Sequence, residues 1–225
     1  MSLSFRGEAA DPVAAEPHTK APVCYDGAPK ADVEGGSMTD EASAQLLAQL
    51  EACIGQPTGS GGPSLAPDEV NLPMIRHWVD AMADHNPVYL DAEFAATTRF
   101  GDIVAPPAML QTWTMGRPTI QGLRERGGAP SEVASGMLWL LDQAGYKSIV
   151  ATNSELEFER YLRLGDRLYA TTVFESVSGE KTTARGTGFF VTWVTTYLDA
   201  DDQVVGRQRF RVFKFKPADA TGETA

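Results

Sequence analysis

The sequence predicts an α+β fold in which an antiparallel sheet wraps around a central helix. First, four long segments in the second half are rich in Val, Thr, Phe and Tyr, alternate in polarity, and are separated by turn sequences. Second, an apolar segment before them begins at Pro106 and Pro107, and proline favours the first turn of a helix, where its missing N–H is not needed. Such a sheet and helix can bury each other's apolar faces. We expect the four segments to form an antiparallel meander: residues 149–161, 167–178, 182–199 and 204–216.

The chain before the sheet consists of successive segments that differ in amino-acid composition. Residues 1–37 are rich in Ala, Pro, Gly and acidic residues without any period, so we expect a disordered or added segment. Residues 38–67 should form an N-terminal helix, over residues 41–54, and a Gly/Pro/Ser-rich linker. The main domain is then expected over residues 68–217, with a tail at 218–225.

Two more helices are expected ahead of the central one. An apolar stripe at helical spacing begins at Leu72 and should end before Asn86, because Pro87 disfavours the helical conformation in the residue before it. A short helix should follow over residues 92–98.

Composition and charge exclude several classes of protein. The chain has 225 residues, a net charge of -11 and 43% hydrophobic residues, which is typical of a globular protein and unsuited to a nucleic-acid-binding surface. Two cysteines cannot form a disulfide framework, no apolar run is long enough to span a membrane, and no signal peptide is apparent. We therefore expect a cytoplasmic protein. Phosphate-loop, CxxC and HExxH motifs are absent from the sequence, so it predicts no metal site.

Polar side chains gather between the second helix and the next turn. Asp84, His85, Asn86 and Tyr89 lie within six residues, and the proline-rich helix start follows about 20 residues later. A carboxylate, an imidazole, an amide and a phenol in one loop can position and protonate a ligand. Asp and Asn also commonly cap helices and form turns, and that purely structural role remains open at this point.

The two motifs together resemble the MaoC-like (R)-specific enoyl-CoA hydratases and dehydratases of the hot-dog fold. Their signature is Gly-Asp-x-Asn-Pro-x-His-x-Asp, followed by Ile-Ala-Pro-Gly-Met-Leu at the central helix. Here residues 83–91 read Ala-Asp-His-Asn-Pro-Val-Tyr-Leu-Asp and residues 103–110 read Ile-Val-Ala-Pro-Pro-Ala-Met-Leu. The resemblance continues in order to about residue 217.

The resemblance implies roles only where residues match. In the family, Asp and His activate the water that adds to the 2-enoyl thioester, while a backbone N–H at the helix start holds the thioester oxygen. Asp84 occupies the Asp position and is the only catalytic candidate, whereas Tyr89 stands where the family has His. Ala108 aligns with the glycine of the second motif, after the extra Pro107. His85 and His77 are weak substitutes for the missing imidazole, and we expect His77 to be a partly buried core or interface residue.

With Tyr89 at the position of the family's His, the chain resembles the larger, non-catalytic subunit of the heteromeric steroid enoyl-CoA hydratases of bacterial cholesterol side-chain degradation. That resemblance implies a smaller catalytic hot-dog partner, in a heterodimer or heterotetramer, and an acyl-CoA substrate. It implies no cofactor, because coenzyme A enters only as part of the substrate. Such subunits often continue into a C-terminal domain that docks an aldolase, and we expect that domain to be absent from this chain, which ends soon after Lys216 and Pro217.

Two groups of residues are candidates for substrate contact, each with a simpler structural explanation. Large apolar side chains could line a tunnel for a steroid or merely pack the core. Basic side chains could meet the phosphates of coenzyme A or form a solvated surface. The expected substrate-binding residues are Asp84, Asn86, Tyr89, Pro107, Ala108, Met109 and Trp113, with Met115 and residues 137–141 as further apolar candidates and Lys147, Arg160, Arg163 and Arg167 as basic ones.

We expect the chain to be a hydratase subunit that shapes the acyl and coenzyme A site while its partner performs the acid/base chemistry. Two alternatives remain: a self-sufficient homodimeric hydratase in which Asp84 acts with His85 or Tyr89, and a non-catalytic acyl-CoA-binding or scaffold module for an aldolase.

Overall fold

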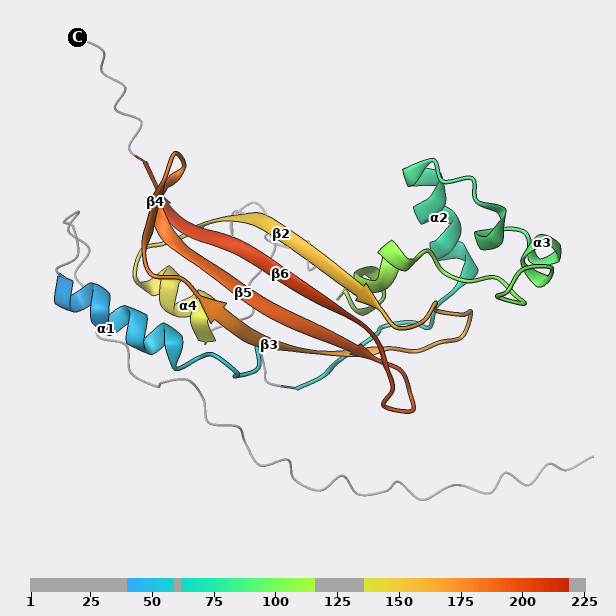
Figure 1. The fold of residues 1–225 in the computed structure, drawn as a ribbon, viewed down its shortest axis with the longest axis horizontal. Coiled ribbons are helices and arrows are strands. Elements are labelled where there is room, and N and C mark those ends of the chain that lie inside the picture. The colour runs from blue at the N-terminus through green and yellow to red at the C-terminus, as the bar shows by residue number, and fades with distance from the viewer. Residues whose placement is uncertain (1–39, 59–61, 116–135, 219–225) are drawn as a thin grey trace, which may run out of the picture.

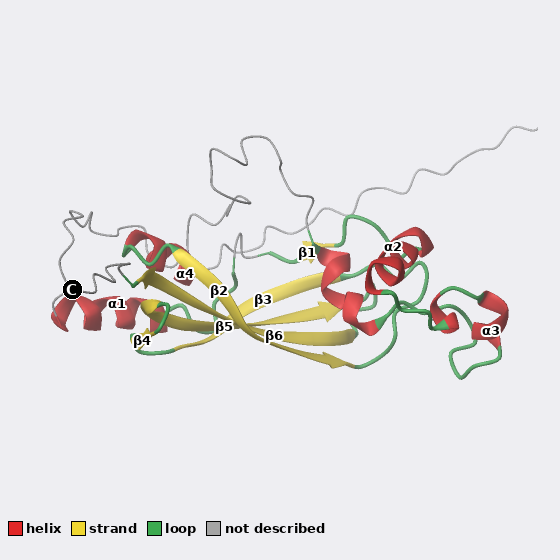
Figure 2. Cartoon of the chain, turned by 90° about the horizontal axis from the view of Figure 1, so that it is seen from above, coloured by secondary structure: helices red, strands yellow, loops and turns green. Residues whose placement is uncertain are grey.

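The computed structural model describes residues 40–58, 62–115 and 136–218. Its main feature is a long, twisted antiparallel sheet with helices at both ends (Figures 1 and 2). The strands are β1 (Ser64–Leu65), β2 (Ser148–Phe158), β3 (Tyr169–Val177), β4 (Lys181–Thr183), β5 (Gly186–Leu198) and β6 (Val204–Pro217). The α+β class is confirmed, and the four expected strand segments all lie in this sheet.

The expected meander is wrong for its first strand. The sheet order is β1-β3-β5-β6-β2, so β2 pairs with β6 and not with β3, its neighbour in sequence. Strand alternation predicts where strands lie but carries no information on which strands pair. The third segment also begins differently, because Lys181–Thr183 turns back at Arg185 and pairs with the start of β5 as the separate strand β4.

The turn between β4 and β5 depends on Gly186. Its φ is 137°, in the region that favours glycine, and an added Cβ would lie 1.9 Å from the carbonyl oxygen of Lys216 on β6. Close approach of three strands at this point therefore requires a residue without a side chain.

The helices before residue 115 follow the expected order with small shifts at their ends, whereas the helix after residue 135 was not expected. They are α1 (Asp40–Glu51), α2 (Leu72–Met82), α3 (Ala92–Ala96) and α4 (Gly136–Gln143), with short 3₁₀ segments η1 (Pro87–Tyr89) and η2 (Pro107–Thr114). Asn71 caps α2 by accepting a hydrogen bond from the N–H of Met74 at 3.0 Å. None of these helices is long and apolar enough to cross a membrane.

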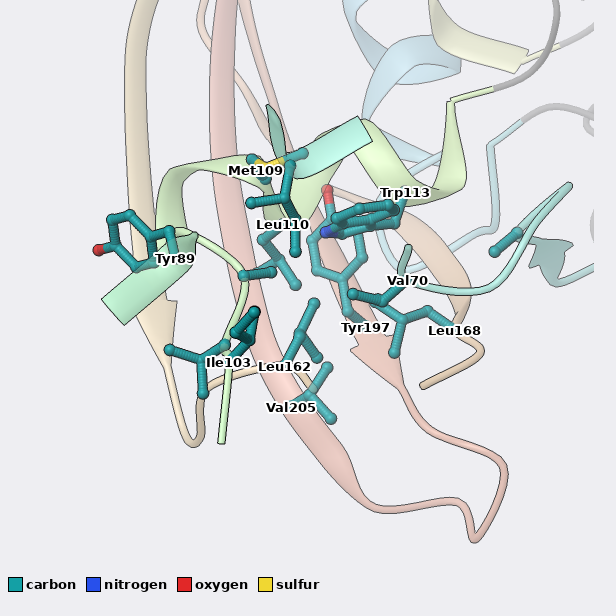
Figure 3. Close-up of a cluster of buried hydrophobic side chains, with 14 of the residues drawn as sticks. Val70, Tyr89, Ile103, Met109, Leu110, Trp113, Leu162, Leu168, Tyr197 and Val205 are labelled. Carbon is teal, nitrogen blue, oxygen red and sulfur yellow. The ribbon is translucent and has the colours of Figure 1, made fainter. Parts of the chain in front are cut away.

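The central helix starts at Pro107 as expected, but it is an eight-residue 3₁₀ helix in the described part of the chain. It packs with α2 on the core face of the sheet through Met109, Leu110 and Trp113, which meet Tyr197 of β5 and Val205 of β6 in one buried cluster (Figure 3). A second buried cluster joins α1 and α4 to the other end of the sheet.

The expected N-terminal linker takes part in the sheet. Gly55 donates a hydrogen bond to the carbonyl of Phe174 at 2.8 Å, Thr58 donates to Thr172 at 2.9 Å, and Ala66 donates to Leu168 at 2.8 Å. These contacts cover the outer edge of β3, while Leu50 of α1 is fully buried in the second cluster. The segment expected to be disordered, residues 1–37, and the tail from residue 219 lie outside the described residues.

Candidate functional site

The loop after α2 is shaped by its own polar side chains. Ala83 ends the helix in the left-handed conformation, with φ 51°, and turns the chain outward. Asp84 Oδ1 then accepts a hydrogen bond from the N–H of Asn86 at 3.1 Å, and Asn86 Oδ1 accepts one from the N–H of Val88 at 3.2 Å, capping η1. Asp84 and Asn86 therefore do form turn and cap contacts, and these contacts hold the loop in a defined shape.

Tyr89 is the buried member of this loop. Its ring is 9% exposed and packs in the cluster with Met109, while Figure 3 shows the hydroxyl pointing away from that cluster. Burial, then the negative charge of Asp84, then Tyr161 raise the pKa of Tyr89, and a hydrogen bond with Asn86 opposes the rise in part. A tyrosine with a raised pKa is neutral near pH 7, so Tyr89 is a hydrogen-bond donor and a poor general base.

The start of η2 offers a second polar group. Pro106 is extended and buried, Pro107 is half-buried, and Ala108 is exposed. The N–H of Met109 is bonded to Pro106 at 3.0 Å, whereas the N–H of Ala108 has no acceptor among the described residues. A free, exposed N–H at a helix start can hold a developing negative charge on oxygen.

A third segment, the connection between β2 and β3, completes the site. Val104 forms an isolated bridge with Arg163, and the N–H of Ala105 donates to Leu162 at 2.8 Å, which ties this connection to the chain entering η2. Tyr161 of the same connection influences the pKa of Tyr89. Tyr161 was not among the expected site residues, although it lies in the part of the chain over which the resemblance to the family continues.

The expected apolar wall is part of the core. Met109 is 0% exposed and Trp113 is 4% exposed, and both pack against sheet residues, as the core-packing explanation requires. Met137, Leu140 and Leu141 are likewise buried in the other cluster, while Met115 is 58% exposed. A cavity of about 300 Å³ lies elsewhere, between β2 and the β4–β5 turn, and its lining includes none of the expected site residues. Met109 and Trp113 are therefore part of the packed core of this chain.

The two candidate histidines lie on the surface of the chain. His85 and His77 are both exposed, so His77 is not the partly buried core residue that was expected, while a place in an interface stays a prediction. His77 lies on the solvent side of α2, away from the buried Ile75 and Val79. Across residues 40–58, 62–115 and 136–218, no group of three His, Cys, Asp or Glu side chains is arranged to hold a metal ion.

The structure separates the four basic candidates. Arg160 forms ion pairs with Asp166 at 2.6 Å and Asp199 at 2.9 Å, so it fastens the β2–β3 connection to the end of β5. Lys147 precedes β2 beside α4, at the end of the sheet opposite α2 (Figure 1). Arg167 contacts the carbonyl of Ala66 at 3.5 Å. Arg163 is the one of the four that lies beside η2 without a carboxylate partner among the described residues.

Comparisons with known proteins agree with this architecture. Residues 61–208 match the family described as FAS1-like, dehydratase domain region. The chain is 45% identical over 171 residues to a probable enoyl-CoA hydratase alpha subunit of Thermomonospora curvata, covering 75% of this chain and 51% of that protein. It is 39% identical over 175 residues to the 3-oxo-4,17-pregnadiene-20-carboxyl-CoA hydratase alpha subunit of Mycobacterium tuberculosis, covering 77% and 52%.

A solved structure is similar to this chain in both sequence and fold. The crystal structure of the ChsH1-ChsH2 complex from Mycobacterium tuberculosis matches with a TM-score of 0.65 and 36% identity, covering 80% of this chain and 95% of that one. The chain spans about half the length of the two curated relatives above. It belongs to the FAS1-like, MaoC-like dehydratase family and has the hot-dog fold.

Proposed function

We propose that this chain is one subunit of a heteromeric enoyl-CoA hydratase, in which it shapes the acyl and coenzyme A site while a smaller hot-dog partner supplies the catalytic Asp and His. The observation that carries the proposal is Tyr89. It stands at the position of the family's histidine, and burial and Asp84 raise its pKa, so it cannot take a proton from water at neutral pH. The alpha-subunit names of two relatives support a heteromeric assembly.

The reaction is the reversible addition of water to a 2-enoyl-CoA. The partner's base takes a proton from water, the resulting oxygen bonds to the β carbon, and the α carbon is protonated as the enolate collapses. On this chain, Asp84, Asn86 and Tyr89 present polar groups to the substrate beside the start of η2. The free N–H of Ala108, next to Pro107, is placed to donate to a substrate oxygen.

The place of the partner is the open edge of β2. This strand pairs with β6 on one side, and no strand among the described residues covers its other side. Most of its side chains are exposed, including Ile149 at 52% and Phe158 at 45%. An uncovered edge of eleven residues is a ready template for a strand of another protomer, which fits a heterodimer or a heterotetramer.

The acyl group is proposed to be a steroid side chain, on the strength of the pregnadiene-carboxyl-CoA relative. Because Met109 and Trp113 are packed into the core here, the wall of the acyl site on this chain would be formed by exposed groups at η2, such as Ala108 and Met115. The remaining wall would come from the partner.

The experiment is reconstitution. The chain is purified alone and with the hot-dog subunit that copurifies with it from the native host, and hydration of crotonyl-CoA and of a steroid side-chain enoyl-CoA is followed. We expect negligible turnover by the chain alone, turnover by the complex, and a higher kcat/KM for the steroid substrate. Robust turnover by the isolated chain that is lost in His85→Ala would overturn the proposal in favour of a self-sufficient hydratase.

A further inference from the structure

The cavity of about 300 Å³ between β2 and the β4–β5 turn lies apart from the proposed reaction site, at the end of the sheet that carries β4 (Figure 1). Its lining includes Val150, Phe190 and Phe213, which are cross-strand neighbours on β2, β5 and β6. Phe189 and Val212, the next residues along these strands, pack with α1 and α4 in the second buried cluster. Because side chains alternate across a strand, the cavity opens on the face of the sheet opposite α1 and α4.

The inner surface of the cavity is aromatic. The rings of Phe190 and Phe213 stack with centroids 4.6 Å apart, and Phe213 stacks in turn on Phe215 at 5.1 Å. Phe213 is 2% exposed and Phe190 is half-buried, so Phe190 is the ring that a ligand would meet first. Stacked rings at the base of a cavity favour the binding of another ring or of a compact apolar group.

The two sides of the cavity are held by hydrogen bonds. On β2, a bulge carries Thr152, whose Oγ1 donates to the carbonyl of Arg211 at 3.0 Å. In the β4–β5 turn, the N–H of Arg185 donates to Thr183 Oγ1 at 3.2 Å, and its carbonyl accepts from the N–H of Ala218 at 3.1 Å. These contacts form the cavity before any ligand binds, which lowers the entropy cost of binding.

Arg211 brings a fixed positive charge to the rim. Its Nε donates to Thr152 Oγ1 at 3.2 Å, and its Nη2 donates to Asn153 Oδ1 at 2.6 Å. The guanidinium also lies 5.3 Å from the ring centroid of Phe190. Thr152 and Phe190 both line the cavity, so these contacts place the guanidinium beside it. All of its partners among the described residues are uncharged, and its charge is therefore available to an anion.

The neighbouring arginine on the same face of β6 is different. Arg209 lies opposite Glu155 in the register with β2 and forms an ion pair with Glu175 at 2.7 Å. Arg211 lies opposite Asn153. An aspartate at position 153 would neutralise the guanidinium of Arg211, whereas the amide orients it and leaves the charge unbalanced.

Arg185 adds a second positive charge. It lines the cavity and is exposed, and its side chain forms no hydrogen bond or ion pair with a described residue. The lining contains no Asp or Glu, although the chain as a whole has a net charge of -11. Guanidinium groups bind carboxylates strongly through paired N–H groups.

We propose that this cavity binds a small carboxylic acid with an aromatic or other compact apolar body. The apolar body lies on Phe190, and the carboxylate meets Arg211 and Arg185 at the rim. The site lies at the end of the sheet opposite α2, and its occupation does not depend on the proposed hydratase reaction.

The test uses a matched pair of probes, 2-naphthoate and its neutral amide 2-naphthamide. Calorimetric titration of the full chain should show saturable binding of 2-naphthoate and about tenfold weaker binding of 2-naphthamide, which lacks the charge. Arg211→Gln and Arg185→Gln should each weaken the binding of 2-naphthoate about tenfold.

Asn153→Asp is the sharpest variant, because it places a carboxylate of the same size beside Arg211. It should weaken the binding of 2-naphthoate about tenfold, while the midpoint of urea denaturation stays the same or rises. Gln203→Glu and Arg76→Gln are the matched controls. Both positions are exposed and lie at the other end of the sheet, so these variants make the same change in net charge and should leave the affinity unchanged.

Three results would overturn the inference. The first is equal affinity for the acid and the amide, which would mean that the guanidinium groups take no part. The second is unchanged affinity for 2-naphthoate in both Arg211→Gln and Asn153→Asp. The third is an affinity that weakens as the concentration of the chain rises, which would show that a second copy of the chain covers the cavity.

Discussion

At the scale of single residues, the surroundings of Tyr89 and Asp84 favour binding over proton transfer. The phenol is buried and neutral, and Asp84 Oδ1 is engaged with the N–H of Asn86 at 3.1 Å. A histidine at position 89 would face the same carboxylate and would be stabilised in its protonated form. Under the proposed function, the side chain at position 89 therefore decides whether this loop performs acid/base chemistry or only holds a ligand.

Tyr89→Phe and Asp84→Asn should each leave kcat of the reconstituted complex within about threefold of its original value, because loss of a true acid or base costs roughly 10²- to 10⁴-fold. Asp84→Asn keeps an oxygen that can accept from Asn86, so the loop retains its shape. Steady-state kinetics with an enoyl-CoA provide the measurement. A hundredfold fall in kcat in either variant would show that the residue is catalytic.

The stability of the chain should fall at alkaline pH because of Tyr197 of β5. Burial raises its pKa to about 12, from an unfolded value near 10. The phenol ionises at a lower pH in the unfolded chain than in the folded one, so its contribution to the free energy of unfolding is fully present below pH 10. That contribution, about 2 to 3 kcal/mol, is lost as the pH rises from 10 towards 12. Denaturant unfolding from pH 9 to 12 measures this loss, which should be smaller in Tyr197→Phe by about 2 to 3 kcal/mol, while the loss that comes from the raised pKa values of Tyr89 and Tyr146 remains. Parallel pH curves for the two proteins would contradict the assignment.

At the scale of elements, one buried side chain joins β2, β5, β6 and η2. Gln208 of β6 is 4% exposed; its Oε1 accepts from the Tyr197 hydroxyl at 3.1 Å, and its Nε2 donates to Gln111 of η2 at 3.1 Å and to Ser154 of β2 at 3.0 Å. The amide has partners for both of its polar atoms. It therefore fixes η2, and with it Ala108, relative to the open edge of the sheet.

Gln208→Leu should destabilise the chain by about 1 to 3 kcal/mol, because the buried hydroxyl of Tyr197 loses its acceptor while the volume is roughly kept. Gln203→Leu, in the exposed turn before β6, is the matched control and should change stability by less than about 0.5 kcal/mol. Urea denaturation at pH 7 compares the two. Equal effects would mean that the network around Gln208 contributes nothing specific.

At the scale of the whole molecule, the sheet is protected on one edge and open on the other. Residues 55–58 and β1 cover β3, whereas β2 is uncovered by any described segment. Under the proposed function, the partner would associate with the open edge of β2 and would lie beside Ser154 and the Gln208 network.

Ile149→Lys on β2 should weaken association with a hot-dog partner, since a charge on an open edge strand opposes strand pairing and removes apolar contact. Val173→Lys is the control: Val173 is 38% exposed, but it lies on β3 between β5 and Pro57, away from the open edge. Light scattering at micromolar concentration, with and without the partner, measures both variants. A monomeric wild-type chain that is unchanged by the partner would refute the role of this edge.

The sequence alone determined most local features of this protein. Alternating residues located the strands, Pro87 and Pro107 marked a helix end and a helix start, and residues 84–91 with 103–110 identified the family. These features depend on neighbouring residues, because backbone restrictions and side-chain periods act over a few positions.

Only the tertiary structure decided how these parts meet. It placed β2 beside β6, used residues 55–58 to cover β3, buried Met109 and Trp113, and brought Tyr161 beside Tyr89. Each of these outcomes depends on contacts between residues far apart in the chain. Strand alternation is the same whichever strand is the neighbour, and an apolar side chain suits a core as well as a tunnel wall, so the choice rests on packing of the whole sheet.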